Sequence, residues 1–275
     1  MMAFLLANHF LLKLFLAPCI ISMATLIARR WGERIGGLVV GLPLTSAPVS
    51  IFFALEQGRQ FAAHAAQEAV AGLIPVAFFC IAYAFSARRL PWYGAALVGV
   101  SLYLASVVSM SLVRANLIIT LLLVAATLLI AIVLVGSPPP SSQPMPRPWW
   151  DLPARMAVAT VMLVLITSLA SFLGSTWSGL LSPFPIFTFV MVAFSHSQGG
   201  ALSAFRIVRG VLVGLFSYVA FFLVVNLFVI SMPLGWVYAL AAALALGING
   251  LSLIVMIRQQ KGIIPEKQDS QTQLG

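Results

Sequence analysis

Two apolar stretches of the sequence combine prolines with hydroxyl side chains, and this combination can do chemistry inside a membrane. They are Ile35–Gly58, IGGLVVGLPLTSAPVSIFFALEQG, and Ser178–Gly200, SGLLSPFPIFTFVMVAFSHSQGG. Proline has no backbone N–H, so a proline within a helix leaves the carbonyl four residues earlier without its partner. Unpaired backbone groups at membrane depth are tolerated where they are buried in protein or line a wet cavity. Proline-interrupted spans in corresponding places point to a transporter's binding site.

The polar residues of these stretches form two hypothetical groups. The first is a substrate-binding group between the broken helices, made of Pro43, Thr45, Ser46, Pro48, Ser50, Ser182, Pro183, Pro185 and Thr188. The second is a gating or ion-coupling group, made of Glu56, Gln57 and Gln198. Pro43 would free the Val39 carbonyl and Pro48 the Leu44 carbonyl. The alternative is local: hydroxyls that bond their own helix, prolines that only kink it, and polar helix ends before glycine caps.

Other kinds of chemistry find no support in the sequence. It has no H-E-x-x-H helix, Walker loop or G-x-S-x-G turn, and its three histidines and two cysteines are scattered. We therefore expect no enzyme, no cofactor and no metal site. Cys19 and Cys80 both lie in apolar runs, which predicts small buried residues rather than a disulfide.

Composition indicates the solvent that surrounds these elements. Hydrophobic residues make up 61% of the chain and charged residues only 8%, with a mean hydropathy of +1.07. Soluble domains are about half apolar and a quarter charged. We therefore predict an all-α polytopic protein embedded in a lipid bilayer. The net charge of +9 could suggest nucleic acid, but the few basic residues are better explained as topology markers.

Runs of about 20 mainly apolar residues are long enough to span a bilayer. Nine such runs are predicted, at residues 11–30, 35–56, 68–87, 91–113, 116–135, 153–173, 177–195, 207–231 and 234–257. With nine spans, 12 of the 15 Lys and Arg residues fall on one face and three, Lys13, Arg59 and Arg114, on the other. The positive-inside rule then predicts an inner-membrane protein whose N-terminus is outside and whose C-terminus is cytoplasmic.

An internal repeat relates the two halves at an offset of 142 residues without a gap. Between residues 11 and 114 the offset gives 17 identities in 104 positions. The matches that carry weight are backbone-determining residues: Gly32 with Gly174, Gly37 with Gly179, Pro43 with Pro185, Gly58 with Gly200, Gly72 with Gly214 and Pro91 with Pro233. Because one span lies between the two units, they would have inverted topology.

The predicted division of the chain follows from this repeat. Residues 1–115 form a first four-helix repeat, 116–152 a linking fifth helix with a Pro-rich cytoplasmic loop, 153–257 an inverted four-helix repeat, and 258–275 a disordered cytoplasmic tail. The organisation, size and hydropathy resemble small secondary carriers such as the drug/metabolite transporter superfamily. Those carriers typically have two five-helix units, whereas the second unit here lacks a fifth helix. This architectural resemblance implies no site residues.

The sequence thus predicts a small secondary transporter with a site near the membrane midplane, formed by the two broken helices. Its partners would be the lipid bilayer, an unknown small-molecule substrate and, as an open possibility, a second copy of the chain, but not nucleic acid. One alternative is a membrane assembly or accessory subunit that does not transport. Another is an intramembrane lipid-handling protein.

Overall fold

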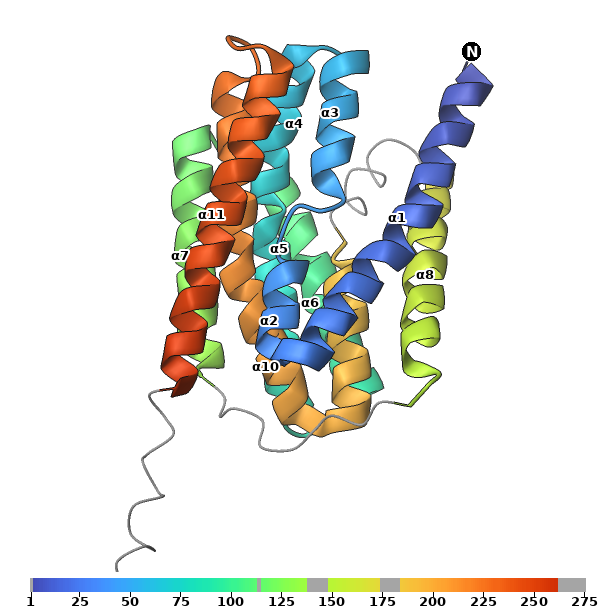
Figure 1. The fold of residues 1–275 in the computed structure, drawn as a ribbon, viewed down its shortest axis with the longest axis vertical. Helices are drawn as coiled ribbons and strands as arrows, with labels where there is room; N and C mark the ends of the chain where they lie inside the picture. Colours follow the sequence, from blue (N-terminus) through green and yellow to red (C-terminus); the bar gives the residue numbers. More distant parts are fainter. Residues whose placement is uncertain (1, 113–114, 138–147, 174–183, 262–275) are drawn as a thin grey trace, which may run out of the picture.

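The computed structural model describes residues 2–112, 115–137, 148–173 and 184–261, and all regular structure in these ranges is helical. Figure 1 shows the helices as one bundle. They are α1 (Met2–Trp31), α2 (Glu33–Val40), α3 (Ser46–Glu56), α4 (Arg59–Ala71), α5 (Leu73–Ala87), α6 (Trp92–Ser111), α7 (Leu117–Val135), α8 (Asp151–Leu173), α10 (Ile186–Phe228) and α11 (Leu234–Lys261).

Helix boundaries agree with the sequence at some places and differ at others. The run 35–56 is divided into α2 and α3, and α4 begins at Arg59, within a stretch predicted as a connection. Its sequence, RQFAAHAAQEAVA, is rich in alanine and other strong helix formers, which explains the extra helix. Helix α11 extends to Lys261, into the predicted tail, and residues 262–275 lie outside the described parts of the chain.

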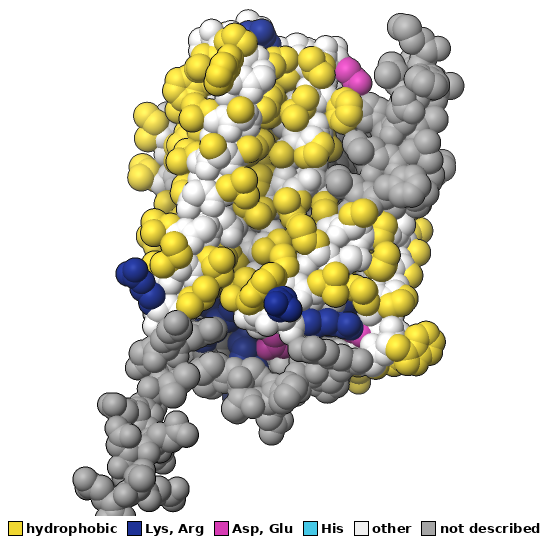
Figure 2. Space-filling model, viewed as in Figure 1, with side chains coloured by type: hydrophobic (Ala, Val, Ile, Leu, Met, Phe, Trp, Pro, Cys, Tyr) yellow, Lys and Arg dark blue, Asp and Glu magenta, His cyan; other side chains and the backbone are white. Residues whose placement is uncertain are grey.

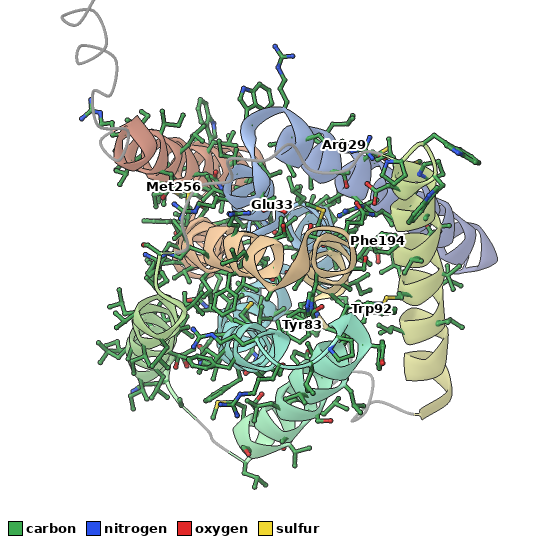
Figure 3. All side chains as sticks on the ribbon, turned by 90° about the horizontal axis from the view of Figure 1, so that it is seen from below. Arg29, Glu33, Tyr83, Trp92, Phe194 and Met256 are labelled. Atoms are coloured by element: carbon green, nitrogen blue, oxygen red, sulfur yellow. The ribbon has the colours of Figure 1, made fainter. Side chains whose placement is uncertain are left out.

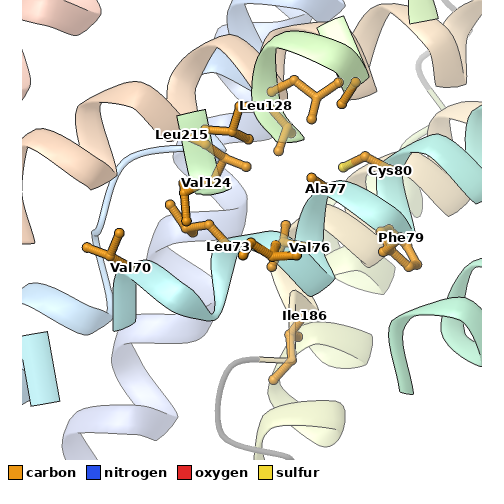
Figure 4. Packing of buried hydrophobic residues seen from close by; sticks show 14 of the residues in the cluster. Val70, Leu73, Val76, Ala77, Phe79, Cys80, Val124, Leu128, Ile186 and Leu215 are labelled. Carbon is orange, nitrogen blue, oxygen red and sulfur yellow. The ribbon is translucent and has the colours of Figure 1, made fainter. Parts of the chain in front are cut away.

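Helix α10 is the central element of the bundle and the longest helix described. It covers 43 residues, and Gly200 interrupts it with φ 72° and ψ −171°, a conformation that is open to glycine but strained for other residues. The chain reverses there, at the bottom of Figure 1, so α10 is two antiparallel helices in series. Its two halves pack against α2, α4, α5 and α11 among others. Figure 4 shows part of the core, where Leu215 and Ile186 of α10 lie among Leu73, Val124 and their neighbours.

Large apolar side chains cover the outside of the bundle. Figure 2 shows hydrophobic side chains over most of the visible face, with Lys and Arg gathered at the bottom. Leu122 and Val133 of α7 are 66% and 77% exposed, and Leu246 of α11 is 62% exposed. Among the described residues, five segments are long and apolar enough to cross a membrane: Arg59–Ala87, Trp92–Ser111, Leu117–Val135, Ile186–Phe228 and Leu234–Arg258. These features are compatible with an integral membrane protein.

Candidate functional site

The break between α2 and α3 lies within the first proline-containing stretch. Helix α2 ends at Val40, α3 begins at Ser46, and Pro43 is buried between them. Pro48 lies in the first turn of α3, where a backbone N–H has no helical partner in any case, so it breaks nothing. The break itself therefore comes from the Gly41-Leu42-Pro43 segment.

The carbonyl that loses its helical partner is not the one expected from the sequence. The Val39 carbonyl accepts the Leu42 N–H at 3.1 Å, so Pro43 does not leave it free. Because the Leu42 N–H turns to Val39, the Leu38 carbonyl loses its usual donor and accepts the Asn249 side-chain amide of α11 at 3.2 Å. The break is thus held from another helix, by a side chain that the sequence places far away.

Two of the hydroxyls that follow the break, those of Ser46 and Ser50, also have partners on other helices. Tyr238 of α11 donates its phenolic hydrogen to the Ser50 carbonyl at 2.8 Å, and the Ser50 hydroxyl lies 2.9 Å from the same phenol oxygen. A phenol has one hydrogen, so the Ser50 hydroxyl must donate in the second bond. Ser46 hydrogen-bonds Tyr218 of α10, and Thr45 caps α3 without a side-chain bond to the helix.

Glycines bring α2 and the second half of α10 into backbone contact at the break. A Cβ added to Gly41 would lie 2.6 Å from backbone atoms of Gly214, and one added to Gly210 would lie 2.0 Å from the Arg34 carbonyl oxygen. Gly37 makes a similar approach to Ile207. Small residues four apart on each helix permit this closeness, as is common between membrane helices.

The second proline-containing stretch is described from Phe184 onward. Ser182 and Pro183 lie outside the described residues. Pro185 directly precedes α10, and Thr188 is buried in its first turn. An aromatic series joins this end of α10 to α5 and α6: the Phe184 ring lies 5.3 Å from Tyr103, and the Phe189 ring lies 6.3 Å from Phe79. Farther along, Tyr83 and His196 are hydrogen-bonded at 3.3 Å.

The two predicted half-sites therefore pack against different helices. The α2–α3 break is held by the second half of α10 and by α11, whereas the start of α10 packs against α5 and α6. Among the described residues, no hydrogen bond joins Ser46 or Ser50 to Thr188. The substrate-binding group stays a prediction, and two of its hydroxyls, those of Ser46 and Ser50, are bound to other helices in this conformation.

The two ends of the molecule differ in how they use the predicted gating residues. Glu56 and Gln57 close α3 and are exposed. Gln198 precedes the reversal at Gly200, and its amide donates to the Asp151 carboxylate at 2.5 Å. We call the end of the bundle that carries Arg29, Glu33, Arg34, Asp151, Arg155, Gln198, Arg206 and Arg209 the charged end.

Asp151 is the centre of a buried network at the charged end. Arg29 donates to its carboxylate at 2.7 Å and Arg155 at 2.8 Å. Asp151 and Arg155 are each 1% exposed, and the Arg155 guanidinium also lies 5.1 Å from the centre of the Phe194 ring. Glu33 pairs with Arg206 at 3.2 Å. Figure 3 views the molecule from this end, with Arg29, Glu33 and Phe194 labelled on α1, α2 and α10. The network thus ties α1, α2, α8 and α10 together.

The arginines also set the protonation of Asp151. Burial by itself would raise the pKa of this carboxyl. Hydrogen bonds and charge from Arg155, together with hydrogen bonds from Arg29 and Gln198, outweigh burial and hold the pKa of Asp151 below its usual range. Asp151 is therefore a carboxylate at neutral pH, and the network is ionic.

Sequence reasoning missed this network because it assigned most of these arginines to connections between spans. The structure instead places Arg34 and Arg206 within helices and buries both. One sequence signal was present: Asp151 and Arg155 are four residues apart, so they share a helix face. No comparable signal connects Glu33 with Arg206, which are distant in the sequence. Within the described parts of the chain, no three His, Cys, Asp or Glu side chains are grouped as metal ligands would be.

Comparison of the chain with protein-family models, with curated proteins and with solved structures finds no match in any of the three.

Proposed function

We propose that this protein is a small secondary transporter of the inner membrane, a carrier rather than an enzyme, built from two inverted four-helix repeats. In this proposal the chain crosses the membrane nine times, because α2 with α3 makes one crossing, α4 with α5 another, and α10 two. The charged end is cytoplasmic, as the positive-inside rule requires. The substrate passes between the α2–α3 break and the start of α10.

The observation that carries the proposal is the agreement of helix ends across the 142-residue offset. Helix α1 ends at Trp31 and α8 at Leu173, while α6 begins at Trp92 and α11 at Leu234. Gly58 and Gly200, which are also 142 residues apart, both have positive φ, 93° and 72°. In Figure 1 α1 runs toward the charged end and α8 away from it, while α6 runs away from it and α11 toward it. Inverted repeats of this kind support alternating access in known carriers.

The asymmetry between the two ends also supports a carrier. The charged end is closed by an ionic network between α1, α2, α8 and α10, and Gln198 is part of it. At the opposite end, Glu56 and Gln57, which correspond to Gln198 and Gly199, are exposed. A carrier that alternates between two states would open one end as it closes the other, and the residues that differ between the repeats are where such a gate would act.

Topology is the first test. A reporter that is active only in the periplasm should be inactive when fused after Gly136 and active when fused after Gly174. The opposite pattern would reverse the orientation and remove the inverted relationship.

Accessibility to water is the second test, in a Cys19→Ser background whose remaining cysteine, Cys80, is buried. Single cysteines at Thr45, Ser46 and Thr188 should react with a membrane-impermeant thiol reagent from at least one side. Cysteines at the exposed residues Gln57 and Ser197 are the positive controls for the outer and inner sides, and a cysteine at Thr120, buried in α7, is the negative control. If positions 45, 46 and 188 never react while the positive controls do, no water-lined path exists, and a non-transporting membrane subunit becomes the better explanation.

A further inference from the structure

The charged end holds more positive charge than its own carboxylates neutralise. Its described residues include five arginines, Arg29, Arg34, Arg155, Arg206 and Arg209, but two carboxylates, Glu33 and Asp151. Arg34 and Arg206 are 7% and 8% exposed, and Arg155 is 1% exposed. Burying cationic groups in excess of their partners is costly, so this arrangement favours a bound anion.

Arg34 is the arginine of the charged end with a buried donor left unpaired, and one oxygen each of Glu33 and Gln198 is also buried there without a partner. The Asp151 carboxylate is shared by Arg29 and Arg155, and Glu33 pairs with Arg206. The Nε of Arg34, by contrast, is buried without a hydrogen-bond partner. Burial lowers the pKa of Arg34, and the nearby charges of Arg206 and Arg209 lower it further, so both of these arginines lie close enough to repel Arg34. A buried donor without an acceptor is unusual in folded proteins and calls for an explanation.

We propose that the charged end binds an oxyanion, held by Arg34 together with Arg206 and Arg209. The planar guanidinium presents paired N–H donors that match phosphate and carboxylate oxygens. Helix α2 and the second half of α10 also begin at this end, and their amino-terminal dipoles favour negative charge. An anion there would accept from the Arg34 Nε and offset the surplus of buried positive charge.

This inference deepens the proposed function, on which it rests for its biological meaning. For a transporter, the oxyanion would be the charged part of a substrate that enters or leaves on the cytoplasmic side. The ionic network would then be the place where the substrate and the closed gate compete for the same arginines. Binding itself does not depend on transport, so the two ideas can fail separately.

The test is a thermal-stability titration of the purified full-length Cys19→Ser protein. Unfolding is followed by the reaction of Cys80, which is 0% exposed in the folded state, with a fluorogenic maleimide. Sodium phosphate should raise Tm in a concentration-dependent way, whereas sodium chloride at equal ionic strength should not. Arg34→Gln should weaken the apparent phosphate affinity by about tenfold or more, as expected for losing charge-assisted hydrogen bonds. Arg34→Lys keeps the positive charge but not the paired guanidinium donors, so it should give a smaller loss of phosphate affinity. It also serves as a second variant if Arg34→Gln cannot be purified.

Arg30→Gln is the matched control, because Arg30 is exposed at the end of α1 and stacks on Trp31. It should leave the phosphate affinity unchanged. If phosphate stabilises the protein no more than chloride does, or if Arg30→Gln weakens binding as much as Arg34→Gln, the anion site is overturned.

Lipid and soluble sources of the oxyanion are separated by repeating the titration in nanodiscs. If phosphatidylglycerol nanodiscs abolish the phosphate response and phosphatidylcholine nanodiscs keep it, the oxyanion is a lipid headgroup. A response retained in both assigns the site to a soluble oxyanion. A phosphate response combined with unreactive cysteines at positions 45, 46 and 188 would leave the anion site in place and remove the transporter.

Discussion

Replacing Gly210 with alanine tests the backbone contact between α2 and α10, on which the position of the helix break depends. An added Cβ would lie 2.0 Å from the Arg34 carbonyl oxygen and 2.9 Å from both the Arg34 carbonyl carbon and the Leu38 nitrogen. All three are backbone atoms, so no side chain can rotate away. The two helices would have to separate by more than an ångström, which disturbs the packing of Gly37 and Gly214 along the same contact.

The magnitude follows from the packing of the core. Overpacking a well-packed contact typically costs about 1–3 kcal/mol, and more where backbone must move. For a chain of this size, each kcal/mol corresponds to roughly 2–4 °C in Tm, so Gly210→Ala should lower Tm by about 2–12 °C. Gly247→Ala in α11 is the matched control, because no atom lies within 4 Å of its added Cβ. There alanine should stabilise the helix by about 0.5–1 kcal/mol.

The assay is the thermal exposure of Cys80 to a fluorogenic maleimide in the Cys19→Ser background. The two substitutions are chemically identical, so opposite signs of the change in Tm would isolate the contact between α2 and α10. If Gly210→Ala is as stable as its parent, the two backbones do not meet as described, and the anchoring of the helix break must be abandoned.

Three further predictions concern other contacts. Asp151→Asn leaves the buried Arg155 without a carboxylate and should lower the free energy of unfolding by about 3–5 kcal/mol at pH 7. Because the folded pKa of Asp151 is lowered, its stabilising contribution is complete above the unfolded pKa of about 3.9 and is lost as pH falls through the folded pKa. The Tm difference between Asp151→Asn and its parent should therefore shrink only in acid. Ser50→Ala and Tyr238→Phe should show a coupling of about 0.6–1.7 kcal/mol in a double-mutant cycle, and strict additivity would contradict the paired hydrogen bonds. Gly200→Ala should cost about 1–3 kcal/mol of backbone strain, whereas Gly235→Ala should not, and equal Tm values for the two would contradict the reversal at Gly200.

Local rules of backbone chemistry predicted a large part of the fold. The all-helical class followed from composition, and the interruption near Pro43 followed from proline's missing donor. Helix ends at Glu56, Ala87, Val135 and Leu173 also coincide with predicted span ends. Such features depend on a few neighbouring residues, so they can be read along the chain.

Other expectations failed where a distant residue changed the local result. The Val39 carbonyl was expected to lack a hydrogen-bond donor, but it accepts the Leu42 N–H. The Leu38 carbonyl therefore loses its helical donor, and the Asn249 amide of α11 donates to it instead. Asn226 of α10 likewise bonds to another helix, because its amide donates to the Ala63 carbonyl of α4. No sequence rule could have named these partners, because each lies more than a hundred residues away.

By itself the sequence determined that the chain is helical, where several of its helices end, and that large apolar side chains cover its outside, because these depend on backbone chemistry and composition. Tertiary structure decided which polar groups meet. It brought Arg29, Arg155 and Gln198 onto one carboxylate, tied Ser50 to Tyr238, and left the Arg34 Nε buried and unpaired. Electrostatic surplus and hydrogen-bond satisfaction are properties of groups gathered in space, and in a linear sequence the same arginines are indistinguishable from markers of topology.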